Sequence, residues 1–166
     1  TNNRVLVYNL DANGEFLDRI PDRVLGQVNF IANAAAITQA GLSGPSAMAF
    51  DPTKNLLYVL NVNRVTVYDV AAISNGENAV FVLGQATFIA NTAGNTQAGM
   101  NSPRGIALDV TGQRLFVSQN GNNRVTAYDV STIVNGENAT NVLGQFTFTA
   151  TTASSTASGM NAPRGV

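Results

Sequence analysis

Gly105-Ile106-Ala107-Leu108-Asp109, Arg114-Leu115-Phe116-Val117-Ser118 and Arg124-Val125-Thr126-Ala127-Tyr128-Asp129-Val130 are the runs that decide the fold. Each run is short, rich in β-branched and aromatic residues, and bounded by Gly, Asn or Asp, which is typical of strands separated by turns. The same runs recur upstream at 46–51, 56–60 and 64–70, and the third recurs again at 4–10. The pattern predicts antiparallel strands joined by short polar turns.

The repetition is regular along the whole chain. Arg4, Arg64 and Arg124 are 60 residues apart, and Val-Leu-Gly-Gln occurs at 24–27, 82–85 and 142–145. A proline follows each of these glycines after 19 residues, at 45, 103 and 163. A long period with one small sheet in each repeat favours a β-propeller over a sandwich or a β-helix.

We expect four strands in each repeat, the fourth ending in Val-Leu-Gly-Gln after a connection that carries Asn-Gly-Glu. Both faces of the third strand carry Val, Leu or Tyr, which predicts sheets covered on both sides. Asp51 and Asp109 are expected to close Asx-type turns between the first two strands. Asn120-Gly121 is expected to supply the positive φ angles of a tight hairpin before the third strand.

Three of these segments together resemble an NHL repeat. They are Pro-Arg-Gly-Ile-Ala-Leu-Asp at 103–109, Leu-Phe-Val-Ser at 115–118 and Gly-Asn-Asn-Arg-Val-Thr-Ala-Tyr-Asp at 121–129. The resemblance covers essentially the whole chain and implies a propeller, commonly of six blades. The Val-Leu-Gly-Gln strand and the stretch after it resemble the lengthened NHL repeats of bacterial secreted and cell-surface proteins. One departure is Gln119, which stands where NHL repeats commonly carry an acidic residue.

The expected fold is therefore all-β, a propeller segment of four-stranded antiparallel blades within a six-bladed ring. Two blades are complete, at 45–102 and 103–162, and two are partial, at 1–44 and 163–166. Because the two ends are out of phase and leave strand edges unpaired, we expect a segment of a longer repeat array. The alternative is a self-contained half-ring whose copies complete one another by strand exchange.

Composition excludes several classes of function. The 166 residues are 45% hydrophobic and 11% charged, with nine Lys+Arg against ten Asp+Glu and a formal net charge of −1. Such a balance gives no positive field for nucleic acid, and no apolar run is long enough for membrane insertion. With no Cys and no His, thiol nucleophiles, Cys/His zinc sites and Ser-His-Asp triads are excluded. We expect no cofactor.

Few residues are candidates for chemistry. Arg104 and Arg164 follow the prolines at the mouth of the first strand, where in a propeller they would border the central channel and bind an anion with Asn101 and Asn161. The three arginines that begin the third strand are expected to hydrogen-bond neighbouring carbonyls and maintain the geometry of each repeat. Asp51 and Asp109 are interpreted as turn residues and not as calcium ligands. No catalytic or metal-binding residue is predicted.

Three nearly uncharged stretches of constant length follow Val-Leu-Gly-Gln, at 28–42, 86–100 and 146–160. They are expected to be ordered, either as an interaction surface or as solvated connecting loops. The function expected is a non-catalytic extracellular or cell-surface scaffold of a prokaryote, a homo-oligomer or part of a longer chain. Its partner would be a protein, a glycan or copies of itself bound through open blade edges. The alternative is a channel-mouth ligand site or a lyase-like or lactonase-like enzyme whose catalytic residues lie elsewhere.

Overall fold

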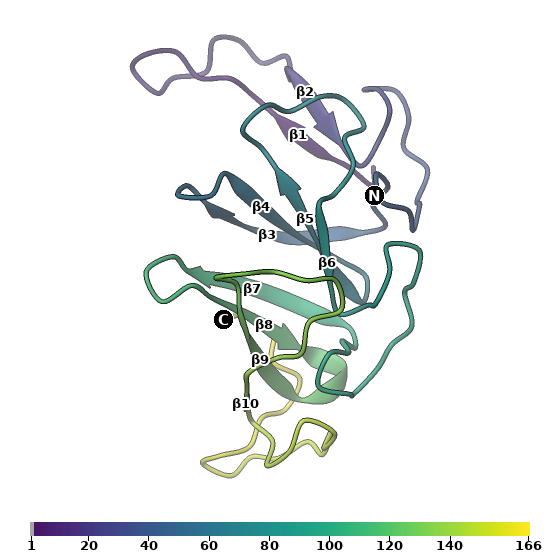
Figure 1. Ribbon diagram of the computed structural model, residues 1–166, viewed down its shortest axis with the longest axis vertical. Helices are drawn as coiled ribbons and strands as arrows, with labels where there is room; N and C mark the ends of the chain where they lie inside the picture. Colours follow the sequence, from purple (N-terminus) through teal and green to yellow (C-terminus); the bar gives the residue numbers. More distant parts are fainter. Residues whose placement is uncertain (1) are drawn as a thin grey trace.

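The computed structural model describes residues 2–166 as an all-β molecule with antiparallel sheets of two, four and four strands (Figure 1). The first sheet pairs β1 (Val5–Val7) with β2 (Arg23–Leu25). The second has the order β3 (Pro45–Asp51), β4 (Leu56–Asn61), β5 (Arg64–Asp69) and β6 (Phe81–Leu83). The third repeats that order with β7 (Pro103–Asp109), β8 (Arg114–Gln119), β9 (Arg124–Asp129) and β10 (Asn141–Leu143).

The two four-stranded sheets share one register. Leu60 pairs with Val65 in the second sheet as Ser118 pairs with Val125 in the third. Both sheets have a register shift after the first proline, so that Ser46 and Arg104 occupy β-bulges at equivalent positions. The predicted strands of these two repeats are confirmed to within one or two residues.

The first repeat departs from the expected strand at 4–10, because only Val5–Val7 forms a regular ladder. Beyond it, the Asn9 N–H donates to the Asp22 carboxylate at 2.7 Å, and Leu10 pairs with Phe16 as an isolated bridge. The chain here turns into a hairpin of its own, seen at the upper left of Figure 1.

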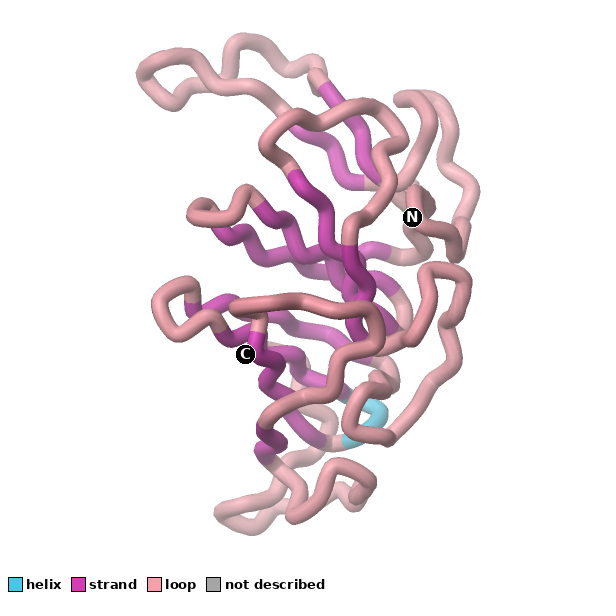
Figure 2. The backbone as a smooth tube through the Cα atoms, in the orientation of Figure 1, coloured by secondary structure: helices cyan, strands magenta, loops and turns pink. Residues whose placement is uncertain are grey.

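The sheets stack face to face, and the hydrophobic core lies between them. One face of the second sheet places Tyr58 and Leu60 against Leu115 and Val117 of the third sheet. Its other face places Val59 and Tyr68 in a cluster with Leu25 and Leu42 of the first repeat. The second sheet is therefore covered on both sides, as predicted, and β3 and β7 run side by side (Figures 1 and 2).

The predicted Asx turns are confirmed. Asp51 Oδ1 accepts the Thr53 N–H at 2.8 Å, and Asp109 Oδ1 accepts the Gly112 N–H at 2.8 Å. In these turns the carboxylate oxygen takes the place of a backbone carbonyl as the acceptor of the N–H group.

The positive φ angles predicted at Asn120-Gly121 are wrong, although β8 and β9 do form a hairpin with Gln119 opposite Arg124. The segment Asn120–Asn122 forms a short 3-10 helix, and the positive φ of 51° falls on Asn123. The Gly121 N–H donates to the Asn101 carbonyl, and the buried Asn122 amide donates to Gln119 Oε1 at 2.8 Å. These contacts hold the segment in a helical turn.

The outer sheets each leave one face open. Tyr8 is 36% exposed although Tyr68 and Tyr128, at the same position of later repeats, are fully buried. Leu143 is 52% exposed although the equivalent Leu83 is fully buried. In the described part of the chain, no helix is long and apolar enough to span a membrane.

Candidate functional site

Arginine at the start of the third strand is the centre of the repeated polar structure. Arg64 and Arg124 are fully buried, and each donates to an amide oxygen three or five residues earlier, at Asn61 or Gln119. Their pKa values are lowered by burial, which disfavours the charged form. Backbone carbonyls around each guanidinium supply the compensating hydrogen bonds.

These carbonyls belong to two successive connections. The name connection 1 is used below for residues 28–42, connection 2 for 86–100 and connection 3 for 146–160. Arg64 donates to the Gly41 carbonyl of connection 1 at 3.0 Å and to the Phe88 carbonyl of connection 2. Arg124 donates to Gly99 of connection 2 at 2.8 Å and to Phe148 of connection 3. The expectation that these arginines bind neighbouring carbonyls is confirmed.

The asparagine before each arginine makes two further hydrogen bonds, one to the connection of its own repeat and one to a residue just after that connection. Asn63 Nδ2 donates to the Asn91 carbonyl at 3.2 Å, and its Oδ1 accepts the Ser102 N–H at 2.9 Å. Equivalent pairs of bonds are made by Asn3 and Asn123. In every repeat this side chain joins the middle of the connection to the residue two positions beyond its end.

The glutamine of Val-Leu-Gly-Gln provides a third repeated contact. Gln85 Nε2 donates to the carbonyls of Asn63 and Thr92, both at 2.9 Å. Gln27 and Gln145 bind their own repeats in the same way. The connections are thus ordered by side chains at fixed sequence positions, which explains their constant length.

A separate set of bonds latches one repeat to the next. Asn135 Oδ1 accepts the Val82 N–H at 3.0 Å, and the Gly136 N–H donates to the Val82 carbonyl at 3.0 Å. Gln97 Nε2 donates to the Ala139 carbonyl at 2.7 Å, and the Ala139 N–H donates to the Gln97 carbonyl. Asn75, Gly76, Ala79 and Gln39 repeat this latch between the first and second repeats.

The outer surface of the connections carries isolated apolar side chains. Ile31 is 90% exposed, Ile89 at the same position of connection 2 is 77% exposed, and Phe146 is 95% exposed. Figure 1 shows connections 1 and 2 along the right-hand edge of the stack and connection 3 at its lower end. Asn, Thr or Gln lies within two residues of each of them in the sequence.

The predicted anion-binding residues are only partly brought together. Arg104 is exposed and lines a hollow of about 270 Å³ with Ser46 and Asn63. Arg164 is exposed on the next inner segment, where its carbonyl would lie 2.7 Å from a Cβ placed on Gly105. Asn101 instead packs against the 3-10 helix, with its Oδ1 accepting from Ser102 at 3.2 Å. Asn161 is exposed.

Carboxylates do not gather into a cation site. Across residues 2–166, no group of three or more His, Cys, Asp or Glu side chains could hold a metal ion. Asp51 is fully buried, and hydrogen bonds from Thr53 and Lys54 lower its pKa against the opposing effect of burial. The turn interpretation of Asp51 stands on these contacts.

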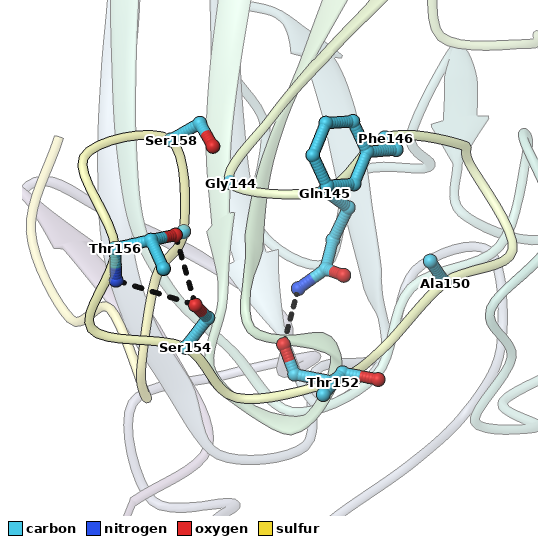
Figure 3. Close-up of a pocket in the computed structure, with 9 residues that line it drawn as sticks. Gly144, Gln145, Phe146, Ala150, Thr152, Ser154, Thr156 and Ser158 are labelled. Carbon is cyan, nitrogen blue, oxygen red and sulfur yellow. Dashed lines mark hydrogen bonds between the residues drawn. The ribbon is translucent and has the colours of Figure 1, made fainter.

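Connection 3 encloses a pocket of about 330 Å³, with Ser154, Thr156 and Ser158 on one side and Gln145, Phe146 and Ala150 on the other (Figure 3). Sequence reasoning missed this pocket, because it depends on the folded path of the connection. The signal available was the recurrence of Thr and Gly at equivalent positions of all three connections.

Neither the scan against protein-family models nor the search of curated proteins finds a match to this chain.

Proposed function

We propose that the chain is a propeller segment of the NHL type, in which each four-stranded sheet is a blade of a six-bladed ring. The shared register, the equivalent bulges and the adjacency of β3 and β7 as inner strands support this proposal. The arginine and asparagine latches recur between successive repeats, as stacking of like units requires. In this proposal the complete blades are 45–102 and 103–162, and the partial blades are 1–44 and 163–166.

The proposed function is that of a non-catalytic extracellular scaffold that binds a protein or glycan partner. The observation that carries it is the exposure of Ile31, Ile89 and Phe146, one on each connection, where buried arginines order the backbone. Repeated weak contact points on a rigid frame suit multivalent binding, because each added contact is then intramolecular. Rigid connections also lose little conformational entropy on binding.

An exported prokaryotic protein is the source that fits this composition best. Charged residues make up 11% of the chain, and Lys54 is the single lysine. The connections carry Thr, Asn, Ser and Gln but no charged residue, which offers hydrogen bonding to a cell-wall glycan or a neighbouring surface protein.

Binding to the cell surface tests this function. The fluorescently labelled chain is titrated onto intact cells and isolated cell walls of the organism that makes it. The triple variant Ile31→Ser, Ile89→Ser and Phe146→Ser is expected to bind at least tenfold more weakly. Its matched control replaces three exposed apolar residues outside the connections, Leu17→Ser, Ile20→Ser and Val134→Ser, and is expected to stay within twofold of the wild type. Equal binding by both triple variants contradicts the proposal.

The second candidate is an anion site near the start of β7 and the start of the last segment, 163–166. Arg104 is favoured because its bulge turns an exposed guanidinium toward the hollow shared with Ser46 and Asn63. Inorganic phosphate is the probe, and isothermal titration is the measurement. Saturable binding that Arg104→Ala abolishes supports this candidate, and a stoichiometric divalent ion found by metal analysis would favour its enzymatic form.

A further inference from the structure

Asn-Gly pairs occur in all three connections between the third and fourth strands, at 13–14, 75–76 and 135–136. In such a pair the glycine nitrogen readily attacks the asparagine side chain, because glycine has no Cβ to hinder the approach. All three asparagines are exposed, so access of water does not distinguish them. The contacts of the three turns do.

The second and third turns are held against the preceding repeat through both of the reacting groups. Asn75 Oδ1 accepts the Val24 N–H at 3.0 Å, and the Gly76 N–H donates to the Val24 carbonyl at 3.0 Å. The pair at 135–136 makes the same two bonds to Val82, also at 3.0 Å. In each latch the side-chain carbonyl and the glycine nitrogen are therefore bound to the two backbone groups of one valine.

The backbone of these two turns is also closely packed. A Cβ placed on Gly76 would lie 3.1 Å from Val28 Cα, and one placed on Gly136 would lie 2.9 Å from Ala86 Cα. Each turn thus lies directly on the start of the connection that precedes it. The attacking nitrogen must come within about 3.5 Å of the side-chain carbon in the correct alignment. In the latched turns this approach requires both groups to leave the valine.

The first turn is a hairpin closed by its own residues. The segment from the arginine of the third strand to this glycine is two residues shorter than in the other repeats. The Asp11 N–H donates to the Glu15 carbonyl at 2.8 Å, and the Gly14 N–H donates to the Asp11 carbonyl at 3.0 Å. Asn13 Nδ2 makes a 3.4 Å contact with Asp11 Oδ2, and a Cβ on Gly14 would have nothing within 4 Å. This turn rearranges without separating one repeat from another.

We propose that Asn13 is a site of spontaneous deamidation and that the latches between repeats protect Asn75 and Asn135 from the same reaction. The Gly14 nitrogen bonds to Asn13 Cγ, the Cγ–Nδ2 bond breaks, and the proton of the glycine nitrogen passes through solvent to the leaving ammonia. The product is a succinimide, which water opens to aspartate or isoaspartate. Overall, one water is consumed and one ammonia is released.

Deamidation of a latched asparagine requires the neighbouring repeats to separate locally. Its rate then follows the population of the open state. Isoaspartate adds one carbon to the backbone before the glycine, so the two bonds to the valine do not re-form together. The inference goes beyond the proposed scaffold function and does not depend on it.

A fourth Asn-Gly pair, at 120–121, lies in the 3-10 helix. The Gly121 N–H donates to the Asn101 carbonyl at 3.2 Å, and Asn120 Nδ2 donates to the Ala162 carbonyl at 3.3 Å. We expect this pair to react as slowly as the latched pairs, because its glycine nitrogen is also held by a distant carbonyl.

Peptide mapping by mass spectrometry tests the assignment, after incubation of the folded 166-residue chain at mildly alkaline pH. We expect deamidation at Asn13 to be at least tenfold faster than at Asn75 and Asn135. In urea, where the latches are absent, the three rates should agree within about threefold, since each asparagine precedes glycine. Gly14→Ala should slow the reaction at Asn13 at least tenfold, which identifies the glycine nitrogen as the attacking group.

Two glutamine variants test the protection at each interface separately. Gln39→Ala removes a donor from the latch between the first and second repeats, and Gln97→Ala removes the equivalent donor between the second and third. Gln39→Ala should accelerate deamidation at Asn75 at least threefold and leave Asn135 unchanged. Gln97→Ala should do the reverse, so each variant is the control for the other. Circular dichroism verifies that both remain folded.

Three outcomes overturn the inference. The first is a folded chain in which Asn75 or Asn135 reacts as fast as Asn13. The second is a chain whose latched asparagines react no faster in urea than in the folded state. The third is a pair of glutamine variants that change both rates equally or change neither. Cell-surface binding by freshly prepared chain is independent of these rates, so the two proposals can fail separately.

Discussion

Arg124 and Arg4 occupy the same position in the repeat but lie in different surroundings. Arg124 is fully buried where connections 2 and 3 meet, and its guanidinium binds carbonyls of both. Arg4 is half-buried and bonds to connection 1 alone. The same side chain is therefore part of the core where two connections meet, and half-buried where only one is present.

The largest expected effect separates these two arginines. Arg124→Ala leaves the carbonyls of Thr96, Gly99 and Phe148 without their donor and removes a buried side chain, which should cost about 4 kcal/mol of unfolding free energy. Arg4→Ala should cost about 1 kcal/mol, because a single bond at a half-exposed site is lost. Urea unfolding of the two variants measures the difference, and equal losses would contradict the comparison.

Two glycines allow the packing of the repeated sheets to be compared with that of the hairpin in the first repeat. Gly84 has φ of 87°, and a Cβ there would lie 2.8 Å from Met100 Sδ. Gly14 has φ of 82° with nothing within 4 Å of a Cβ. Gly84→Ala should cost about 3 kcal/mol from backbone strain and overpacking, and Gly14→Ala about 1 kcal/mol from strain alone. Thermal unfolding distinguishes them, and a larger loss at Gly14 would refute the packing account.

Alkaline pH tests the buried tyrosines. Burial raises the pKa of Tyr128 to about 12 in the folded chain, against about 10 when unfolded. Between pH 10 and pH 12 the folded state keeps a proton that the unfolded state loses, so stability falls as pH rises through this window. The fall should be about 2 kcal/mol from this residue.

Tyr128→Phe is the matching variant. The phenol oxygen has no hydrogen-bond partner, so the substitution should leave stability at pH 7 within about 1 kcal/mol of the wild type. It should also make the alkaline fall smaller, as measured by urea unfolding at pH 8 and pH 11. An unchanged fall would show that another group titrates there.

The smallest predicted effect concerns the latch between repeats. Asn135→Ala removes the acceptor of the Val82 N–H and should cost about 1 kcal/mol. Asn13→Ala, at the corresponding Asn-Gly of the first repeat, should cost less than half as much, because Asn13 Nδ2 makes only a 3.4 Å contact with its neighbour Asp11. Chemical denaturation of both variants measures the ratio, and a ratio near one would weaken the distinction between latched and free turns.

Most of the strand arrangement could be predicted from the sequence, because runs such as 56–60 and 124–130 combine β-branched residues with Asn, Asp and Gly at their ends. The structural role of Arg64 and Arg124 could also be predicted, since a residue repeated in every unit at one position serves the unit. The turn at Asn120-Gly121 was predicted wrongly, because its conformation depends on the distant Asn101 carbonyl and on Gln119.

The pocket within connection 3 was beyond sequence reasoning for a physical reason. Its lining residues, Thr156 and Gly159 among them, are brought together only by the folded path of the connection. The exposed positions of Ile31 and Phe146 were equally hidden, because an apolar residue in a low-charge stretch carries no mark of whether it faces the core.

Hydrogen exchange at the arginine Nε–H groups, followed by NMR, tests the central claim most directly. The Nε–H of Arg64 and Arg124 donate to Asn61 and Gln119, whereas that of Arg4 has no partner within residues 2–166. We predict slow exchange at Arg64 and Arg124, and exchange at Arg4 that is at least tenfold faster. Three arginines that exchange alike would contradict the account.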